Sequence, residues 1–125
     1  MTDLQRDPLT DKIIGCAIEV HRRLGPGLLE SVYESALCIE LGHCGLKFQS
    51  QLALPIKNRD RSIGELRIDI VVENSVILEL RSVERIDPLF EAQLLTYLRL
   101  SGIKIGLLIN FNSRLLHQGI KRFVV

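Results

Sequence analysis

Apolar residues recur at helical spacing in the first third of the chain and predict two helices there. The first is expected over residues 10–24, with Thr10 as its N-cap and a Gly-Pro-Gly sequence directly after it. Its apolar stripe consists of Ile13, Ile14, Ala17, Ile18 and Leu24. The second is expected over residues 28–43, and Gly42 and Gly45 bracket its end. Its apolar face consists of Leu29, Val32, Tyr33, Ala36 and Leu37.

The pattern then changes to that of strands. Extended segments are expected at residues 47–57 and 61–73, joined by a turn at 58–61, and a third strand is expected at residues 76–83. These three segments follow one another closely. They therefore predict a run of antiparallel strands in the middle of the chain.

A third helix and two further strands complete the predicted elements. The helix is expected over residues 87–102, where Asp87 is placed to cap it, Pro88 takes the first helical position and a glycine ends it. Residues 103–111 are apolar almost throughout, which is typical of a strand buried on both faces. Residues 115–125 predict a last strand at the sheet edge.

The order of these elements is ααβββαββ, and it predicts an α/β fold in which helices flank both faces of a mixed sheet. A chain of 125 residues that is 46% hydrophobic has the size of one domain, so we expect residues 1–125 to form a single domain with 1–8 as a flexible N-terminal segment. No apolar run approaches the roughly 18 residues of a membrane span, and the polar N-terminus lacks the apolar region of a secretory signal. We therefore expect a cytoplasmic protein without a membrane segment.

Charge and cysteine content narrow the function only slightly. The net charge is +1, so the chain has no broad basic field of the kind that sequence-independent nucleic-acid binders carry. Three local basic groups remain candidates, although each alone is typical of solvated surface charge. They are Arg22 with Arg23, the group Lys57, Arg59 and Arg61, and Lys121 with Arg122. The three cysteines include no C-x-x-C pair, which fits a reducing compartment and argues against zinc.

The register of the central hairpin can be derived from its alternating residues. Apolar side chains at even positions must share one side of both strands, because a slip of one residue would turn every side chain over. A three-residue loop at 73–75 satisfies this requirement by pairing Val72 with Val76. The same register places Asp69 directly opposite Glu79, where facing Cβ atoms are about 4.5–5.5 Å apart.

Two carboxylates that face each other across a sheet need an explanation, because like charges at this spacing destabilise it. A divalent cation would convert the repulsion into chelation, and Mg²⁺ prefers oxygen ligands of this kind. Alternatively, Arg81 simply neutralises the pair without a metal. The spacing alone leaves both readings open.

Several motifs occur in the same order as in a known family. The sequence GLLESVY at residues 27–33 matches the signature G-x-x-E-x-x-Y, and RID, LELRSVE and EAQLLTYLRLSGIKIGLLINF follow it. Together they resemble the GxxExxY protein family, which is assigned to the PD-(D/E)xK nuclease superfamily. The resemblance covers about residues 9–125 and implies a restriction-endonuclease-like α/β/α core.

The resemblance also implies roles for individual residues. Asp69 matches the metal-binding aspartate, Glu79 matches the acid of the (D/E)xK motif, and the backbone carbonyl of Leu80 is usually a further ligand. Glu30 matches the helix glutamate that commonly completes the site for Mg²⁺ or Mn²⁺. A Gln-x-x-x-Tyr pair supports the site or touches substrate in related nucleases, and Gln93 and Tyr97 match it. Nucleases of this kind often form homodimers.

Two positions depart from the family pattern, and both bear on activity. Arg81 stands where the family has lysine, and Phe90 stands where a polar residue, often histidine, is expected. Arginine has a pKa above about 12 and cannot act as a general base, although its forked donors can stabilise charge on a phosphate.

The sequence is therefore compatible with three functions. The first is a Mg²⁺-dependent nuclease acting on DNA or RNA, in which Asp69, Glu79 and Glu30 hold the metal, Arg81 clamps the phosphate or orients water, and Gln93 and Tyr97 support the site. The second is a lapsed nuclease fold that binds nucleic acid or protein, with Arg81 paired to Glu79 or Asp69. The third is an oligomeric structural or regulatory protein.

Overall fold

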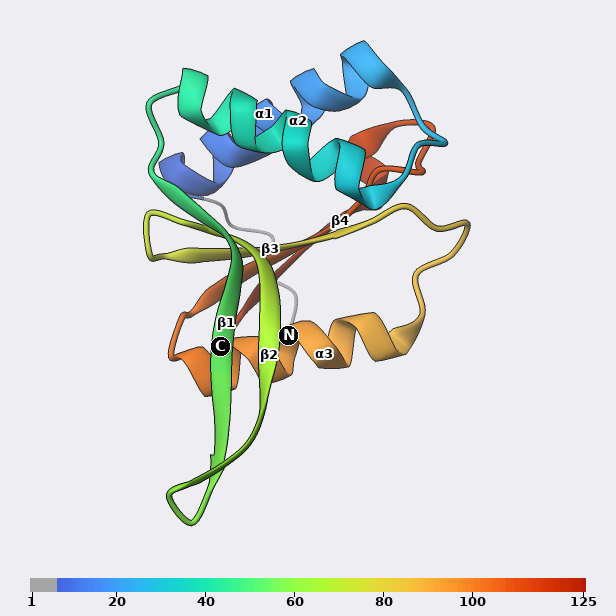
Figure 1. The fold of residues 1–125 in the computed structure, drawn as a ribbon. Coiled ribbons are helices and arrows are strands. Elements are labelled where there is room, and N and C mark those ends of the chain that lie inside the picture. Colours follow the sequence, from blue (N-terminus) through green and yellow to red (C-terminus); the bar gives the residue numbers. More distant parts are fainter. Residues whose placement is uncertain (1–6) are drawn as a thin grey trace.

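The computed structural model describes residues 7–125, and its elements follow the predicted order with the addition of one short 3-10 helix. The elements are α1 (Pro8–Leu24), α2 (Glu30–His43), β1 (Phe48–Asn58), β2 (Arg61–Val72), β3 (Val76–Arg81), α3 (Pro88–Ser101), β4 (Ile105–Asn110), the 3-10 helix η1 (Leu116–Gly119) and β5 (Ile120–Val124). The strands form one mixed sheet in the order β1-β2-β3-β4-β5, with β3 and β4 parallel and the other pairs antiparallel. Helices α1 and α2 cover one face and α3 covers the other (Figure 1), which confirms the predicted α/β class.

Two helices begin with the same Asp-Pro-Leu sequence, and in both the aspartate is the N-cap. Asp87 accepts a backbone hydrogen bond in the first turn of α3, as predicted. In α1 the cap is Asp7, whose carboxylate accepts hydrogen bonds from the backbone N–H of Thr10 at 2.7 Å and from its hydroxyl at 3.2 Å. The prediction of Thr10 as the cap is therefore wrong. Residues 1–6 of the predicted N-terminal segment lie outside the described residues, whereas Asp7 and Pro8 form the start of α1.

The predicted apolar faces of α1 and α2 are only partly buried. The buried members are Ile13, Ile14, Ala17, Tyr33 and Leu37. The exposed members are Ile18 (41%), Leu24 (40%), Leu29 (74%) and Val32 (42%). The two helices pack side by side on one face of the sheet, so each buries only the narrow stripe that faces both the sheet and its neighbour.

Tyr33 holds the loop between α1 and α2 against the end of β4. Its hydroxyl donates a hydrogen bond to the carbonyl of Gly25 and accepts one from the backbone N–H of Leu28 at 3.1 Å. Its ring stacks on Phe111, with centroids 4.5 Å apart. Gly27 has φ +96°, a conformation that side-chain-bearing residues rarely adopt. The glycine and the tyrosine of the G-x-x-E-x-x-Y signature therefore have structural roles.

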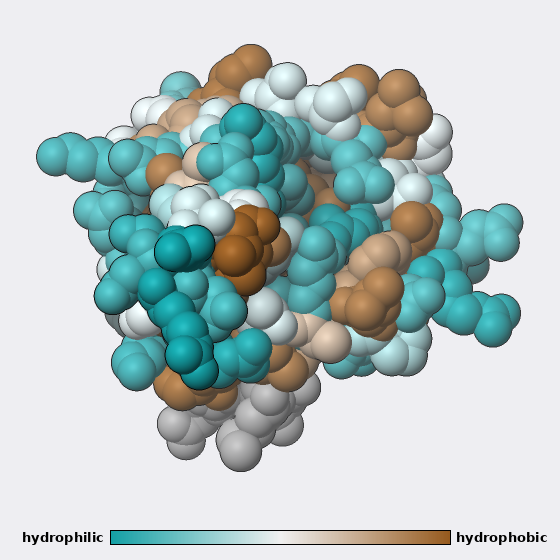
Figure 2. All heavy atoms as spheres, turned by 60° about the horizontal axis from the view of Figure 1, so that its bottom comes forward, coloured by the Kyte–Doolittle hydropathy of each residue, from teal (hydrophilic) through white to brown (hydrophobic). Residues whose placement is uncertain are grey.

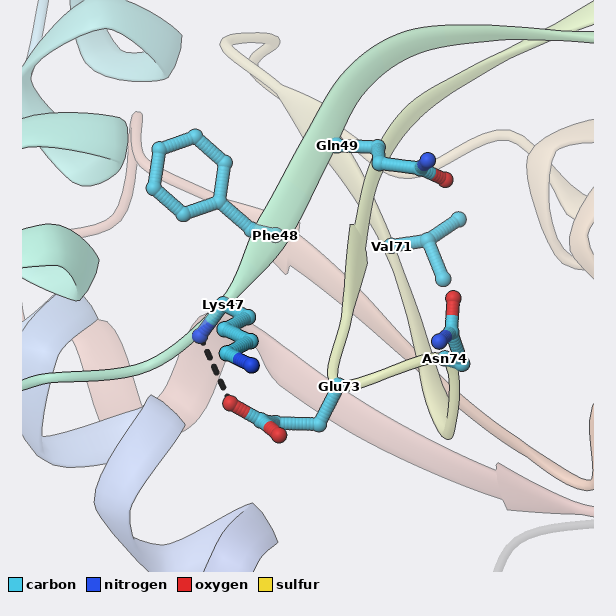
Figure 3. A pocket seen from close by; sticks show the side chains of 6 residues that line it. All are labelled: Lys47, Phe48, Gln49, Val71, Glu73 and Asn74. Carbon is cyan, nitrogen blue, oxygen red and sulfur yellow. Dashed lines mark hydrogen bonds between the residues drawn. The ribbon is translucent and has the colours of Figure 1, made fainter.

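The β2–β3 hairpin has the predicted register. Val72 pairs with Val76 across a three-residue loop, and the pairing continues through Val71 with Ile77 and Ile70 with Leu78. The loop of this hairpin is tied to the start of β1 by Glu73, whose N–H donates to the carbonyl of Lys47 at 2.8 Å. The carboxylate of Glu73 accepts a second bond from the N–H of Lys47 at 2.6 Å, beside a shallow surface pocket (Figure 3).

The alternation of side chains along β2 is interrupted at Asp69. Ile70 and Val72 pack with α1 and α2, as expected for one face, but Ile68 packs in the cluster on the α3 side. The strict alternation predicted for the even residues of β2 therefore fails at this point. The distortion coincides with Gln51 on β1, which has φ +52°. Gln51 lies opposite Asp69, and these two residues are skipped in the pairing of β1 with β2. Beyond the bend, the β1–β2 hairpin extends past α3 (Figure 1).

The parallel strands β3 and β4 are joined by α3 and end at the same edge of the sheet. Strand β3 ends at Arg81 rather than at residue 83, because the side chain of Asn110 replaces a strand partner there. The Asn110 amide donates to the carbonyl of Val83 at 2.9 Å, and its oxygen accepts from the N–H of Val83 at 3.1 Å. The carboxyl end of β3, which carries the candidate site, is fixed in this way to the end of β4.

The C-terminal strand is shorter than predicted. Residues 115–119 do not extend as a strand, because Leu116–Gly119 forms η1 and β5 begins at Ile120. The predicted edge position is correct, since within residues 7–125 β5 pairs with β4 alone. Seen from the α3 side, apolar side chains lie in separate spots among polar ones (Figure 2). Among residues 7–125, the helices are too short or too polar to cross a membrane.

Candidate functional site

Asp69 and Glu79 meet where the ladder between β2 and β3 ends. The next pair after Ile70 and Leu78 would be Asp69 and Glu79, and at this point side chains take over the hydrogen bonds between the strands. The N–H of Asp69 donates to Oε2 of Glu79 at 2.9 Å, and the N–H of Leu80 donates to Oδ2 of Asp69 at 2.8 Å. Each carboxylate is therefore oriented by the backbone of the opposite strand. The predicted register of the hairpin is what makes the two carboxylates adjacent.

Glu79 lies in an environment that disfavours its charge. Its side chain is 3% exposed, and its burial raises its pKa to about 8, with the negative charge of Asp69 as the second cause. The hydrogen bond from the N–H of Asp69 and the positive charge of Arg81 lower the pKa but do not offset the desolvation. Without a bound metal, Glu79 therefore keeps its proton over much of the neutral range.

Arg81 directs its guanidinium into the space between the two carboxylates. Its Nη1 donates to the backbone carbonyl of Leu80 at 2.8 Å and lies 3.8 Å from Oδ2 of Asp69 and 3.7 Å from Oε1 of Glu79. The side chain is only 12% exposed. Both carboxylate distances exceed hydrogen-bonding range, so the attraction is that of loose ion pairs around one short bond to a carbonyl.

Helix α3 forms the opposite wall of the site. Oε1 of Gln93 accepts a hydrogen bond from Nη2 of Arg81 at 2.9 Å, and the Gln93 amide donates to the hydroxyl of Tyr97 at 2.7 Å. The ring of Phe90 lies against the guanidinium, with Cζ of Arg81 4.5 Å from its centroid. Arg81 and Phe90, the two residues at which the resemblance predicts a departure from the family pattern, therefore touch each other. The pKa of Tyr97 is raised, first by burial and then by the nearby carboxylate of Glu79.

Glu30 is not brought into this cluster. It begins α2, is exposed, and has no hydrogen bond or ion pair that reaches Asp69 or Glu79 among residues 7–125. The same described residues contain no group of three His, Cys, Asp or Glu side chains that could hold a metal ion. The carboxylates of Asp69 and Glu79 therefore stand as a pair, with Glu30 outside it.

Glu34 and Gln51 approach the pair instead, and sequence reasoning did not identify them. The Gln51 amide donates to Oε1 of Glu34 at 2.8 Å and lies 3.4 Å from Oδ1 of Asp69. Burial raises the pKa of Glu34, and Asp69 and Glu30 add smaller increases. The available signal was the spacing of Glu34 and Glu30, four residues apart on one face of α2. The position of Gln51 depends on the bend in β1, which no local pattern indicates.

The predicted basic groups are mostly paired with acids. Both Arg22 and Arg23 bond to Glu19, at 2.7 and 2.8 Å. Lys121 pairs with Glu91 at 2.9 Å, and Arg122 with Asp7 at 3.0 Å. The group Lys57, Arg59 and Arg61 stands exposed at the tip of the β1–β2 hairpin, whose turn has positive φ at residues 59 and 60. Of the three groups, this one presents its charge most openly.

The donor atoms at the site fit a hard divalent cation in their chemistry. Two carboxylates and the carbonyl of Leu80 converge, and Mg²⁺ and Mn²⁺ favour such oxygen ligands. In this structure the group that lies among these oxygens is Nη1 of Arg81. The structure thus contains both predicted features at one point, the pair of potential metal ligands and the arginine that can neutralise it.

Comparison with known proteins agrees with this geometry. A family model described as the PD-(D/E)XK nuclease superfamily matches residues 7–123. No curated protein and no solved structure gives a significant match. The matched region includes every element from α1 to β4, the two facing carboxylates on β2 and β3, and nearly all of β5. On these grounds the chain belongs to the PD-(D/E)XK nuclease superfamily.

Proposed function

We propose that this protein is a nuclease-type phosphodiesterase that acts on DNA or RNA with Mg²⁺ or Mn²⁺, and that arginine in place of lysine attenuates its activity. The observation that carries the proposal is the pair of carboxylates, Asp69 and Glu79, each oriented by a backbone N–H of the other strand. Like charges at this spacing are costly in a sheet, and a site for a cation gives them a chemical purpose. The proposal includes assignment to the GxxExxY group, a single domain and a cytoplasmic location.

The residues of the chain divide into three roles. Asp69, Glu79 and the carbonyl of Leu80 would hold the metal, which when bound lowers the pKa of water and offsets charge on the phosphate. Arg81 would contact the scissile phosphate through its forked donors, since it cannot take a proton. Gln93 holds the guanidinium, Tyr97 accepts a hydrogen bond from the Gln93 amide, and both residues close the α3 side of the site.

The α2 carboxylate nearest to the pair is Glu34, so we assign to Glu34 the supporting role that the resemblance implies for Glu30. Gln51 links Glu34 to Asp69. Glu30 would act on the site only through its charge, one helical turn from Glu34. A homodimer would place two such sites on one nucleic acid, and this remains part of the proposal.

The test is cleavage of labelled single- and double-stranded DNA and RNA with and without Mn²⁺. We expect wild-type cleavage to require the metal, and Asp69→Ala and Glu79→Ala each to abolish it. Arg99→Met removes a positive charge at the far end of α3 and serves as a matched control that leaves cleavage unchanged. Cleavage that survives both carboxylate substitutions would contradict the proposal.

The position of Arg81 supports a second candidate, a nuclease fold that binds nucleic acid or protein without cleaving. Its guanidinium already lies among the three oxygens that a metal would need. In that case wild type would show no metal-dependent cleavage, and Arg81→Lys, which restores the family residue, would create it. Robust cleavage by purified wild type would exclude this second function.

A further inference from the structure

We infer that the Arg81 guanidinium is a tethered cation that competes with the divalent metal for the oxygens of Asp69, Glu79 and Leu80, and that Phe90 is the positioning residue that keeps it there. The inference rests on the proposed function only in assigning the metal to these oxygens. It goes beyond that function, because it makes metal binding and the placement of one side chain mutually exclusive.

The competition follows from distances. Nη1 of Arg81 is 2.8 Å from the carbonyl oxygen of Leu80 and within 3.8 Å of both carboxylates. Magnesium binds its ligands at about 2.0–2.1 Å, so an ion shared by these oxygens would stand against the guanidinium nitrogen. Two cations cannot occupy that space. Metal binding therefore requires the guanidinium to leave.

Helix α3 supplies the contacts that hold the guanidinium in place. Phe90 and Gln93 are three residues apart and so lie on one face of the helix. Phe90 presents its ring to Cζ at 4.5 Å, and Gln93 accepts from Nη2 at 2.9 Å. A cation against a partly desolvated ring is attracted by its negative face. A non-aromatic residue at position 90 would lack this attraction, so the ring of Phe90 is one of the contacts that keep the guanidinium in place.

The guanidinium also removes part of the electrostatic advantage that a metal would gain. In its absence the site would present two facing carboxylates and a carbonyl to an incoming ion. In its presence one positive charge is already there, and the ion must displace it. A protein whose binding-competent form is only fractionally populated shows an apparent affinity reduced by that fraction. Arg81 and Phe90 together therefore set the metal concentration at which the site fills.

The experiment measures Mn²⁺ alone. Metal-free protein is titrated with Mn²⁺, and the free ion is followed by electron paramagnetic resonance. We expect Arg81→Met to bind about tenfold or more tightly than wild type, since it removes a charge-assisted hydrogen bond and a cation. We expect Phe90→Leu, which keeps an apolar side chain but removes the ring, to bind about threefold more tightly. Phe90→Tyr keeps the ring face and should match wild type.

Controls separate this effect from general changes in charge or helix stability. Leu89→Ala alters the exposed neighbour of Phe90 on α3, and Arg99→Met removes a cation outside the site, so both should match wild type. Adding Asp69→Asn to Arg81→Met should abolish the tighter binding. Tighter binding that survives Asp69→Asn would place the ion elsewhere and overturn the inference.

Each remaining outcome decides the inference. Equal or weaker Mn²⁺ binding by Arg81→Met overturns it. If that variant does not fold, the comparison of Phe90→Leu with Phe90→Tyr decides, and equal affinities overturn the role of Phe90. If affinities change as expected but no variant cleaves nucleic acid, the proposed function fails and the inference stands. If wild type cleaves with Mn²⁺ while affinities are unchanged, the proposed function stands and the inference fails.

Discussion

The carboxylates on the strands and those on α2 are held in different ways. Asp69 on β2 and Glu79 on β3 each accept a hydrogen bond from the backbone of the other strand. On α2, Glu34 reaches Asp69 only through the amide of Gln51, and Glu30 does not reach it. The strand carboxylates are fixed by the register of the sheet. The helix carboxylates depend on how α2 is rotated on the sheet. We therefore expect substitutions on the strands to have large effects and equivalent substitutions on α2 to have small ones.

The largest effect is expected for Glu79→Gln in metal-free protein. The folded-state pKa of Glu79 is about 8, against 4.5 for the ordinary group, so the folded state holds this proton more tightly than the unfolded state. Stability from this source is fully present below pH 4.5 and is lost as the pH rises toward 8, by about 1.4 kcal/mol per unit at most. Glutamine carries no such charge, and we expect it to be more stable than wild type at pH 9 by roughly 5 kcal/mol.

Urea unfolding of wild type and Glu79→Gln from pH 5 to pH 9, with a chelator present, measures this difference. The wild-type free energy of unfolding should fall relative to that of the variant as the pH rises. The groups that act on Glu79 are Asp69 and Glu34, which raise its pKa, and Arg81, which lowers it. Parallel profiles for the two proteins would show that Glu79 is ionised in the folded state at neutral pH.

The next largest effect is expected for Arg81→Met without metal. This change removes the cation beside the Asp69 carboxylate and the protonated Glu79, and losing a loose, partly buried ion pair together with the guanidinium hydrogen bonds costs about 2 kcal/mol. The loss should appear in the free energy of unfolding measured with urea at pH 7. Saturating Mn²⁺ should restore most of it, because the ion binds only the folded site. A variant as stable as wild type in chelator would show that the guanidinium is not the counter-charge of the pair.

A smaller effect is expected for Glu34→Gln. Burial raises the pKa of this carboxyl group, but the side chain is partly exposed and solvent screens it. The stability it contributes is present below its ordinary pKa of 4.5 and is lost as the pH rises through its raised value, so at pH 7 the glutamine variant should be more stable by less than about 1 kcal/mol. A stabilisation equal to that of Glu79→Gln would break the distinction between strand and helix carboxylates.

The smallest effect is expected for Glu30→Gln, which is matched to Glu34→Gln in chemistry and lies one turn earlier on α2. Glu30 is exposed at the first position of the helix, where a carboxylate gains about 0.3–1 kcal/mol from the helix dipole. We expect the glutamine variant to lose no more than that and to bind Mn²⁺ like wild type. A tenfold loss of Mn²⁺ affinity would show that Glu30 moves into the site when metal binds.

The same contrast explains which parts of the structure the sequence predicts. Alternation in the β2–β3 hairpin has one solution, so the pairing of Val72 with Val76 and the adjacency of Asp69 and Glu79 follow from it. The bend at Asp69 does not follow, because it depends on the packing of Ile68 against residues of the α3-side cluster. Local alternation contains no information about a partner so distant in the chain.

The start of a helix is marked in this sequence by a recurring capping motif. The sequence Asp-Pro-Leu occurs before α1 and before α3, and in both cases the aspartate caps the helix. Thr10, the predicted cap of α1, lies three residues after the actual cap, Asp7, which the shared Asp-Pro-Leu sequence indicates. The face of α2 was beyond such rules, since Leu29 and Val32 are exposed while Leu41 is fully buried. The orientation of Glu30 and Glu34 depends on that packing, so the sequence alone does not show which of them lies nearer to Asp69.

The guanidinium nitrogen among three oxygens has a consequence for how the site can change over generations. A metal ion binds or dissociates as its concentration changes, but an arginine side chain is encoded in the sequence and is always attached. The counter-charge of the Asp69 and Glu79 pair is therefore inherited with codon 81 and is present even where no metal ion is available. One substitution at this codon would replace the covalently attached counter-charge with one that a bound metal ion must supply. The strands that hold the carboxylates would stay as they are.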